Sequence, residues 1–381
     1  MAKITKKIKE EAQDEGMEVL GSFLKSEKAF HYNFEESVTY CVSTGSLLLD
    51  SELEGFGPGF HRFVGPTESG KTSMALEVMK NMLKTVKGSK GFFIKAEGRL
   101  SEKMQKRSGI KFVFSAEEWV VGTCFVFESN VYETAMAAIR NLITKNKNKY
   151  KYCFVVDSSD GLLPKVDLER DFEDANKVAG GAVIASTFAK RASLALSKRG
   201  HMAIWLSQVR AEVKINPHAA GNKQKTSVST GGNALMHYPD FIIEFCTPYQ
   251  GDRITKTGDK TVSSDKNPII GHNAKIIIKK SPNEKTEMSY SYPIKYGRVG
   301  GRSIWLEREV IDFCLMWEFI ERRGAWFSFS EEFTELTKDE EGFPEKVQGL
   351  DGVYKEVESR PALVDKLFKF CKDQIISARP K

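Results

Sequence analysis

The chain has 381 residues, a hydrophobic fraction of 41% and a formal net charge of +6, from 57 basic and 51 acidic side chains. This length allows one large domain with smaller appendages, and the apolar content is sufficient for a sizeable core. No apolar run approaches the roughly 18 residues that span a bilayer, and the first residues do not form a secretory signal. We therefore expect a soluble, cytoplasmic protein without a membrane partner. The small basic excess is compatible with a polyanion partner and does not establish one.

The six cysteines are far apart in the sequence, and no two have the close spacing of a zinc site or a redox motif. We expect free thiols in a reducing compartment. They are Cys41, Cys124, Cys153, Cys246, Cys314 and Cys371.

Residues 3–27 have the pattern of an amphipathic helix, because apolar side chains recur near helical spacing among lysines and glutamates. The pattern leaves two interpretations open. The apolar face could pack on the core of its own chain, or it could dock on a neighbouring subunit.

From about residue 58, short apolar strands alternate with turns and helices, which is typical of a mainly parallel sheet flanked by helices. A smaller, mainly helical C-terminal region begins near residue 300. The expected strands are 61–64, 91–94, 124–127, 152–156, 202–206, 241–245, 274–278 and 289–295, and the main expected helices are 72–86, 133–143 and 178–198. The last strand alternates in the manner of a half-exposed antiparallel strand.

The residues from Gly65 to Thr72, GPTESGKT, have the pattern of a nucleotide phosphate-binding loop. Gly65 and Gly70 allow the backbone N–H groups to converge on the phosphates. The Lys71 ammonium would reach the β- and γ-phosphates, and the Thr72 hydroxyl would coordinate magnesium. The sequence therefore predicts ATP, or a related nucleoside triphosphate, with Mg²⁺ as cofactors. The expected nucleotide contacts are Gly65, Pro66, Thr67, Glu68, Ser69, Gly70, Lys71, Thr72 and Ser73.

Three polar side chains follow expected buried strands. Asp157 could hold the magnesium through water, although many such strands end in an aspartate that only caps the next element. Glu97 lies at the sheet edge where ligands of such folds bind, so it could orient the attacking water, with an ordinary surface glutamate as the alternative. Gln208 could hydrogen-bond to the γ-phosphate, release it on hydrolysis and pass that signal to the loop that follows. Alternatively, it could be a cap or turn residue.

A polar stretch between residues 210 and 232 is too long for an ordinary connection inside a compact domain, so we expect a mobile, functional loop. Its basic residues Arg210, Lys214, Lys223 and Lys225 suit contact with a phosphate backbone. A solvated charged loop is the more frequent meaning of such a run. The loop contains no aromatic side chain for base stacking.

Together these motifs resemble the RecA-type homologous-recombination ATPases, and they are most similar to the divergent recombinases of large bacteriophages. The ordered set covers about residues 40–330 and is more specific than the phosphate loop alone. In chain order the matches are STGSL at 43–47 with Asp50, GPTESGKT at 65–72, KAE at 95–97, VVDS at 155–158 continuing to LPK at 163–165, SQVR at 207–210, GGNAL at 231–235 and GAWF at 324–327.

The resemblance implies a RecA-like α/β core at 41–300, an N-terminal oligomerisation arm at 1–40 and a C-terminal domain at 301–381. It also implies a homo-oligomeric filament that forms on single-stranded DNA with ATP, searches double-stranded DNA for homology and exchanges strands with DNA-stimulated ATP hydrolysis. In this comparison Lys71 and Thr72 bind phosphate and magnesium, and Glu97 activates water. Asp157 and Ser158 complete the metal site, and Gln208 senses the γ-phosphate.

The family keeps its two DNA-binding loops where this chain has residues 167–177 and 210–232. From the charge of the polar stretch and from the family resemblance, the expected DNA contacts are Arg210, Lys214, Lys223, Lys225, Gly231, Gly232 and Asn233. The family also places ATP between subunits, with two basic residues reaching in from the neighbour. Lys280 matches the first of these residues, whereas the second falls on Pro282, which cannot serve.

Other departures from the family also carry expectations. Ser101 and Met104 replace an acid and a tyrosine beside the adenine, so the nucleotide preference should be looser. The sequence ends SARPK at 377–381 instead of in the acidic tail of the bacterial members, so duplex DNA should bind more readily. A phage recombinase would act in the cytoplasm of the bacterial host, with a loading mediator and single-strand-binding protein as partners.

Two rival functions share much of this sequence pattern. A ring-forming replicative helicase has the same ATPase core and also feeds DNA past mobile loops. A regulatory or architectural ATP-binding module would bind nucleotide without DNA-stimulated hydrolysis.

Overall fold

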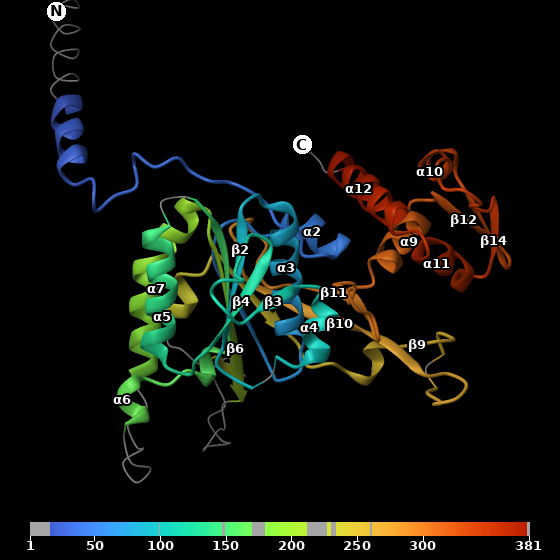
Figure 1. Ribbon diagram of the computed structural model, residues 1–381. Coiled ribbons are helices and arrows are strands. Elements are labelled where there is room, and N and C mark those ends of the chain that lie inside the picture. The colour runs from blue at the N-terminus through green and yellow to red at the C-terminus, as the bar shows by residue number, and fades with distance from the viewer. Residues whose placement is uncertain are drawn as a thin grey trace, which may run out of the picture.

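The computed structural model describes residues 16–98, 100–146, 149–169, 180–211, 227–229, 234–259 and 261–378, and its course is drawn in Figure 1. No helix within these ranges is both long and apolar enough to cross a membrane.

In the described part of the chain, eleven strands form one sheet in the order β11-β10-β8-β1-β6-β5-β2-β4-β3, with β7 beside β6 and β9 beside β10. All pairings from β8 to β3 along this path are parallel, and β10 and β11 form an antiparallel edge. The sheet is therefore mainly parallel, as predicted. The strands are β1 (Gly59–Gly65), β2 (Ser89–Lys95), β3 (Lys111–Val113), β4 (Thr123–Glu128), β5 (Lys151–Asp157), β6 (Met202–Ala211), β7 (Ser227–Ser229), β8 (Phe241–Phe245), β9 (Arg253–Thr255), β10 (Ile269–Lys280) and β11 (Met288–Lys295).

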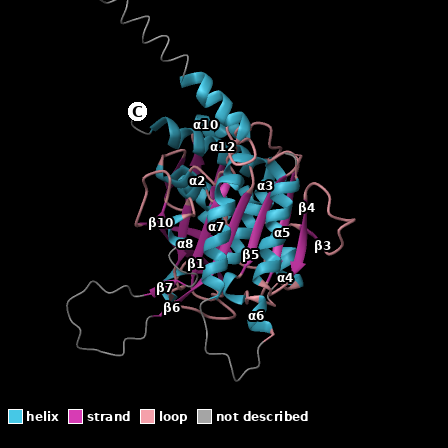
Figure 2. Ribbon diagram, turned by 90° about the vertical axis from the view of Figure 1, so that its left-hand side faces the viewer, coloured by secondary structure: helices cyan, strands magenta, loops and turns pink. Residues whose placement is uncertain are grey.

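Helices cover both faces of the sheet. Figure 2 shows α5 and α7 in front of the strands, and Figure 1 shows α3 and α4 on the opposite side. Along β5, Phe154 packs in the core beneath α5 and α7 while its neighbour Val155 packs in the core beneath α3. Because both faces are buried, the strands are almost continuously apolar, which is why they could be predicted. The helices are α3 (Lys71–Thr85), α4 (Glu102–Ser108), α5 (Tyr132–Lys145), α6 (Lys165–Leu168), α7 (Gly180–Arg199) and α8 (Ala234–His237).

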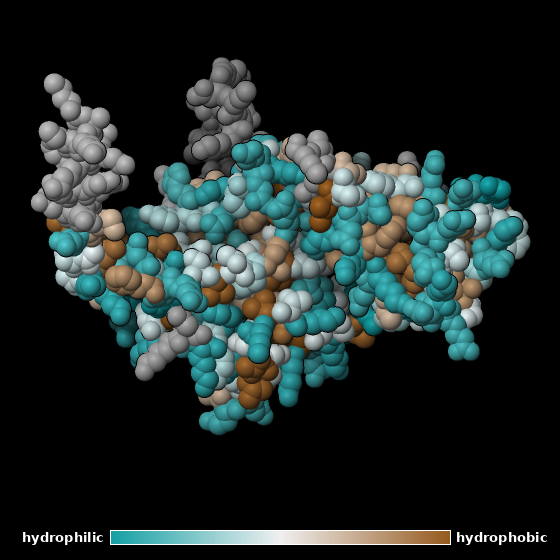
Figure 3. All heavy atoms as spheres, turned by 90° about the horizontal axis from the view of Figure 1, so that it is seen from above, coloured by the Kyte–Doolittle hydropathy of each residue, from teal (hydrophilic) through white to brown (hydrophobic). Residues whose placement is uncertain are grey.

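The N-terminal helix spans residues 16–26 of the described chain and projects away from the core (Figure 1). Its side chains Met17, Val19, Leu20 and Phe23 are all more than half exposed, and Figure 3 shows hydrophobic side chains at this end of the molecule. The interpretation that this face packs on its own core is therefore wrong for these residues. Docking on a neighbouring subunit stays a prediction, and residues 1–15 lie outside the described chain.

The C-terminal region has its own apolar cluster, in which Phe333 and Leu367 are fully buried. Four helices dominate it, as expected, but the sequence did not predict its three-stranded sheet. Strands of three or four residues, with several exposed side chains, are too short to show a clear period. The elements are α9 (Leu306–Met316), β12 (Ile320–Arg323), β13 (Trp326–Phe329), α10 (Glu331–Thr337), β14 (Lys346–Gln348), α11 (Leu350–Glu358) and α12 (Pro361–Ala378).

A half-buried carboxylate, Glu309, joins α9 to the start of a short helix that the sequence also did not predict, α2 (Leu47–Leu53). Its two oxygens accept hydrogen bonds from Ser46 Oγ at 2.6 Å and from the Leu47 N–H at 3.0 Å. Glu309 therefore satisfies donors at the N-terminal end of α2. Burial raises the pKa of Glu309 to about 7, because the carboxylate loses its hydration, although the same hydrogen bonds favour the charged form.

This raised pKa makes stability depend on pH. The folded protein keeps a proton on Glu309 that the unfolded chain releases near 4.5. The stabilisation is therefore complete below that pH and is lost as the pH rises through about 7. The shift corresponds to about 3 kcal/mol of unfolding free energy. We expect Glu309→Gln to reduce the pH dependence of the unfolding free energy, measured with urea from pH 4.5 to 8. The exposed control Glu331→Gln should keep the pH dependence of wild type. Equal slopes in wild type and Glu309→Gln would contradict this account.

Candidate nucleotide-binding site

The phosphate loop connects β1 to α3 at the middle of the sheet, where β1 lies between β6 and β8. Gly65 is required there because a Cβ atom at this position would lie 2.4 Å from the Phe245 carbonyl oxygen. Gly70, with φ of +99°, adopts a left-handed conformation immediately before α3. The loop therefore presents its backbone at the N-terminal end of a fifteen-residue helix, where anions bind favourably.

Lys71 begins α3 and is buried against the loop. Its Nζ donates hydrogen bonds to the carbonyl oxygens of Gly65 at 2.9 Å and Pro66 at 2.6 Å. Ser69 Oγ donates to the same Pro66 oxygen at 2.8 Å. These contacts hold the ammonium group within the loop that would receive the phosphates.

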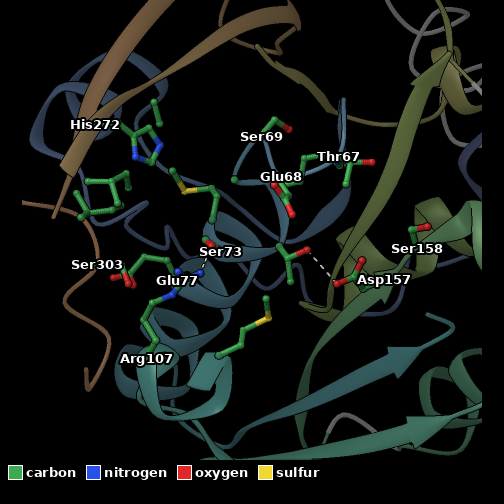
Figure 4. A pocket seen from close by; sticks show the side chains of 18 of the residues that line it. Thr67, Glu68, Ser69, Ser73, Glu77, Arg107, Asp157, Ser158, His272 and Ser303 are labelled. Carbon is green, nitrogen blue, oxygen red and sulfur yellow. Dashed lines mark hydrogen bonds between the residues drawn. The ribbon is translucent and has the colours of Figure 1, made fainter. Parts of the chain in front are cut away.

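Thr72 and Asp157 come together from α3 and the end of β5. Thr72 Oγ1 donates a hydrogen bond to Asp157 Oδ2 at 2.9 Å (Figure 4). A hydroxyl and a carboxylate are hard oxygen donors of the kind that Mg²⁺ prefers. Among the residues described, no group of three His, Cys, Asp or Glu side chains could hold a metal ion by itself. The Thr72–Asp157 pair, with its two oxygen donors, fits Mg²⁺ that is bound jointly with nucleotide phosphates, which is the usual arrangement for this ion.

Glu97, Ser158 and Gln208 meet beside this pair, and all three line one cavity with Thr72 and Asp157. Ser158 Oγ donates a hydrogen bond to Glu97 Oε1, and Gln208 Nε2 lies 3.5 Å from the same oxygen. The sequence left open whether Glu97 was only a surface residue and Gln208 only a cap. The structure brings both side chains to the predicted metal site.

The sequence predicted that Gln208 follows the end of a strand. This prediction is wrong, because β6 continues to Ala211 and Gln208 lies within it. The extension pairs with β7, so that Val209 lies opposite Ser229. β7 lies within the stretch 210–232 that the sequence predicted as a loop, so 210–211 and 227–229 are strand instead, and local sequence could not reveal the pairing. Arg210 therefore lies on a strand. The other predicted DNA contacts, Lys214, Lys223, Lys225, Gly231, Gly232 and Asn233, lie outside the described residues.

Two charged residues that the sequence did not single out support Gln208. Asp160 Oδ2 accepts a hydrogen bond from the Gln208 N–H at 2.7 Å. Arg62, fully buried in β1, donates to Ser207 Oγ at 3.1 Å and to the Leu235 carbonyl oxygen at 3.1 Å. Burial lowers the pKa of Arg62 to about 10, and it remains charged at neutral pH. Arg62 thus joins β6 just before Gln208 to α8, which follows the predicted DNA loop.

The cavity has a volume of about 590 Å³, within the range of small-molecule sites. Asp157 and Ser158 lie at one end of the cavity and His272 and Ser303 at the other (Figure 4), where Ile294, opposite His272 in the sheet, and Ile304, next to Ser303, add apolar side chains. Ser101 and Met104, predicted to lie near the adenine, both line it. This arrangement suits a nucleotide with its phosphates at the loop and its base at the apolar end.

Lys280 lies outside the lining of this cavity, and its Nζ donates to the His237 carbonyl oxygen at 2.5 Å. That Lys280 contacts the nucleotide of a neighbouring subunit stays a prediction. Arg107, which the sequence did not single out, does line the cavity and donates from Nη2 to Ser73 Oγ at 2.6 Å (Figure 4).

The mainly parallel sheet, the loop after β1 and the Thr72–Asp157 pair define a P-loop nucleotide-binding fold. A family model described as the RecA N-terminal domain matches residues 26–282. The chain therefore belongs to the RecA family. The closer similarity to phage recombinases stays a prediction.

Several curated relatives carry the name Protein RecA. Those of Rickettsia africae (strain ESF-5) and Rickettsia canadensis (strain McKiel) are 26% identical over 312 residues and 27% identical over 292 residues. The first alignment covers 81% of this chain and 79% of the relative, and the second covers 76% and 74%. A solved structure of the RadB recombinase shares 16% sequence identity, with a TM-score of 0.44 over 69% of this chain and 98% of that one.

Proposed function

We propose that this protein is an ATP-dependent DNA recombinase. It forms a helical filament on single-stranded DNA with ATP and Mg²⁺, pairs that strand with homologous duplex DNA and exchanges strands, while DNA stimulates ATP hydrolysis. The observation that carries the proposal is the course of β6. Gln208 on this strand lies next to Glu97, and two residues further along the chain the basic stretch begins at Arg210.

The polar end of the cavity supplies the groups for hydrolysis. The Lys71 ammonium binds the terminal phosphates, and Thr72 and Asp157 hold the magnesium, which neutralises phosphate charge when bound. Glu97 orients the attacking water and accepts its proton, with its carboxylate positioned by Ser158.

Gln208 couples this chemistry to DNA. Its side-chain amide hydrogen-bonds to the γ-phosphate and loses that partner on hydrolysis. Asp160 fixes its backbone, and Arg62 connects the adjacent Ser207 to α8. A shift of β6 is therefore passed to both ends of the segment between β6 and α8, so ATP controls the grip on DNA.

Assembly uses the N-terminal arm and Lys280. The exposed apolar face of residues 16–26 docks on the adjacent subunit, and Lys280 reaches that subunit's nucleotide. Single-stranded and double-stranded DNA are the main partners, and a loading mediator that displaces single-strand-binding protein is a further one.

The proposal is tested by measuring ATP hydrolysis with and without single-stranded DNA and imaging the same sample by electron microscopy. We expect DNA-stimulated hydrolysis and open helical filaments. Closed rings would favour a helicase instead. Nucleotide binding without DNA-stimulated hydrolysis would favour a regulatory module, and either result would reject the proposal.

The DNA segment makes its own prediction. Replacing Lys214, Lys223 and Lys225 together by alanine should weaken single-stranded DNA binding and reduce the slope of log affinity against log salt by about 2, at about 0.7 per lost phosphate contact. The matched control replaces Lys84, Lys87 and Lys145, which lie at or just beyond the C-terminal ends of α3 and α5. An unchanged slope in the loop variant would mean that these lysines do not contact phosphates.

A further inference from the structure

Arg107 presents a positive charge to the cavity from α4, on the side of Ser73. The residue lies in the last turn of α4, and the Gly301 N–H donates to its carbonyl oxygen at 2.8 Å, which fixes its backbone. Figure 4 shows its side chain extending from α4 toward Ser73 in the first turn of α3, where Nη2 donates to Ser73 Oγ at 2.6 Å. The guanidinium group is thus held at a defined place in the wall.

Among the described residues, no Asp or Glu side chain forms an ion pair with Arg107 within 4 Å, so none of them neutralises its charge. Glu77, the carboxylate drawn near it in Figure 4, pairs with Lys80 instead. His272, which lines the same cavity, has a pKa below its ordinary value because it is half-buried; nearby Asp252 opposes this shift and Arg107 adds to it. It is therefore neutral at pH 7. A guanidinium has five N–H donors, so most of them stay available beside the Ser73 contact.

The position of Arg107 along the cavity identifies the anion that would neutralise it. Thr72, with Asp157, marks the place of the metal and the terminal phosphates, and Ser73 is the next residue of the same helix turn. Ile294 and Ile304 add apolar side chains beside His272 and Ser303, at the end of the cavity that suits the base. The group of a nucleoside triphosphate between the terminal phosphates and the nucleoside is the α-phosphate.

We propose that Arg107 binds the α-phosphate of the nucleotide, with Ser73 orienting the guanidinium. This inference rests on the proposed binding of ATP. A charge-assisted contact of this kind is stronger than a neutral hydrogen bond, and the planar guanidinium can donate to two phosphate oxygens at once. It adds a second cation to the site, on the nucleoside side of Lys71.

The contact has a kinetic signature. The bonds to the α-phosphate do not change when the γ-phosphate is transferred, so the contact strengthens substrate and transition state equally. Loss of Arg107 should therefore raise KM for ATP and lower the affinity for ADP, while kcat stays nearly unchanged.

The test uses calorimetric titration of the full-length protein with Mg²⁺ and ADP, competition with adenosine, and steady-state hydrolysis of ATP. We expect Arg107→Ala and Arg107→Gln to lower the affinity for ADP by roughly ten-fold or more and to raise KM for ATP by a similar factor. The kcat value and the affinity for adenosine should stay within about two-fold of wild type. Arg107→Lys should recover part of the affinity. The control Lys106→Ala removes a neighbouring exposed cation of α4 and should bind as wild type.

Arg107→Gln separates binding from structure, because its amide can still donate to Ser73 Oγ but carries no charge. Wild-type ADP affinity in Arg107→Gln would overturn the proposal and leave Arg107 a structural contact of α4. An equal loss of adenosine and ADP affinity would also overturn it, since the contact would then be to the nucleoside. Failure of the wild-type protein to bind ADP or ATP would instead reject the proposed function itself.

Discussion

Lys71→Ala should weaken ATP binding by about 100-fold or more and abolish ATP-dependent assembly on DNA. The lost ammonium leaves the phosphate charge uncompensated, and charge-assisted hydrogen bonds are the strongest of their kind. The mutation also removes the hydrogen bonds to the Gly65 and Pro66 carbonyl oxygens, so the loop loses its internal tie. Titration with ATP and Mg²⁺, together with imaging on single-stranded DNA, measures both effects.

Lys87→Ala is the matched control for this prediction, because it removes an exposed lysine just beyond the other end of α3. It should bind ATP and assemble as wild type. If Lys71→Ala, still folded by circular dichroism, kept wild-type affinity for ATP, the assignment of this loop to phosphate binding would be wrong.

Glu97→Gln should separate binding from hydrolysis. The amide has nearly the same shape and can keep a hydrogen bond with Ser158, so ATP affinity should stay within about three-fold. The amide cannot accept the proton of the attacking water, and general bases typically contribute 10²- to 10⁴-fold, so turnover should fall about 100-fold or more. Filaments formed with ATP should consequently persist longer. DNA-stimulated phosphate release and filament lifetime are the two measurements.

Glu128→Gln provides the comparison, since Glu128 ends β4 at the same edge of the sheet and pairs with Lys95 outside the cavity lining. It should hydrolyse ATP at the wild-type rate. A normal rate in Glu97→Gln would show that another group positions the water.

The positions of the phosphate loop, Asp157 and Glu97 at the cavity could be predicted because each depends on short-range sequence, whereas the role of Glu97 stays a prediction. A buried parallel strand is a continuous apolar run, and the polar residue at its end marks the edge where ligands bind. The main strands and helices were predicted for the same reason, with ends that differ by a few residues. The joining of Glu97 to Ser158 then follows from the pairing of β2 with β5.

Residues whose roles depend on distant partners could not be predicted. Arg107 meets a hydroxyl 34 positions away, Arg62 one 145 positions away and Glu309 one 263 positions away. In the sequence each is only a charged residue among many, and no local period marks it. The extension of β6 was missed for the same physical reason, because its partner β7 lies near the other end of the same polar stretch.

The central claim is that this protein uses ATP to exchange DNA strands, and the most direct test is a strand-exchange assay. Circular single-stranded DNA, homologous linear duplex, ATP and Mg²⁺ are mixed with the protein, and joint molecules are resolved on a gel. We predict joint molecules with wild type and none with Lys71→Ala or with ADP in place of ATP. Absence of joint molecules under conditions where the wild-type protein binds both DNAs would contradict the claim.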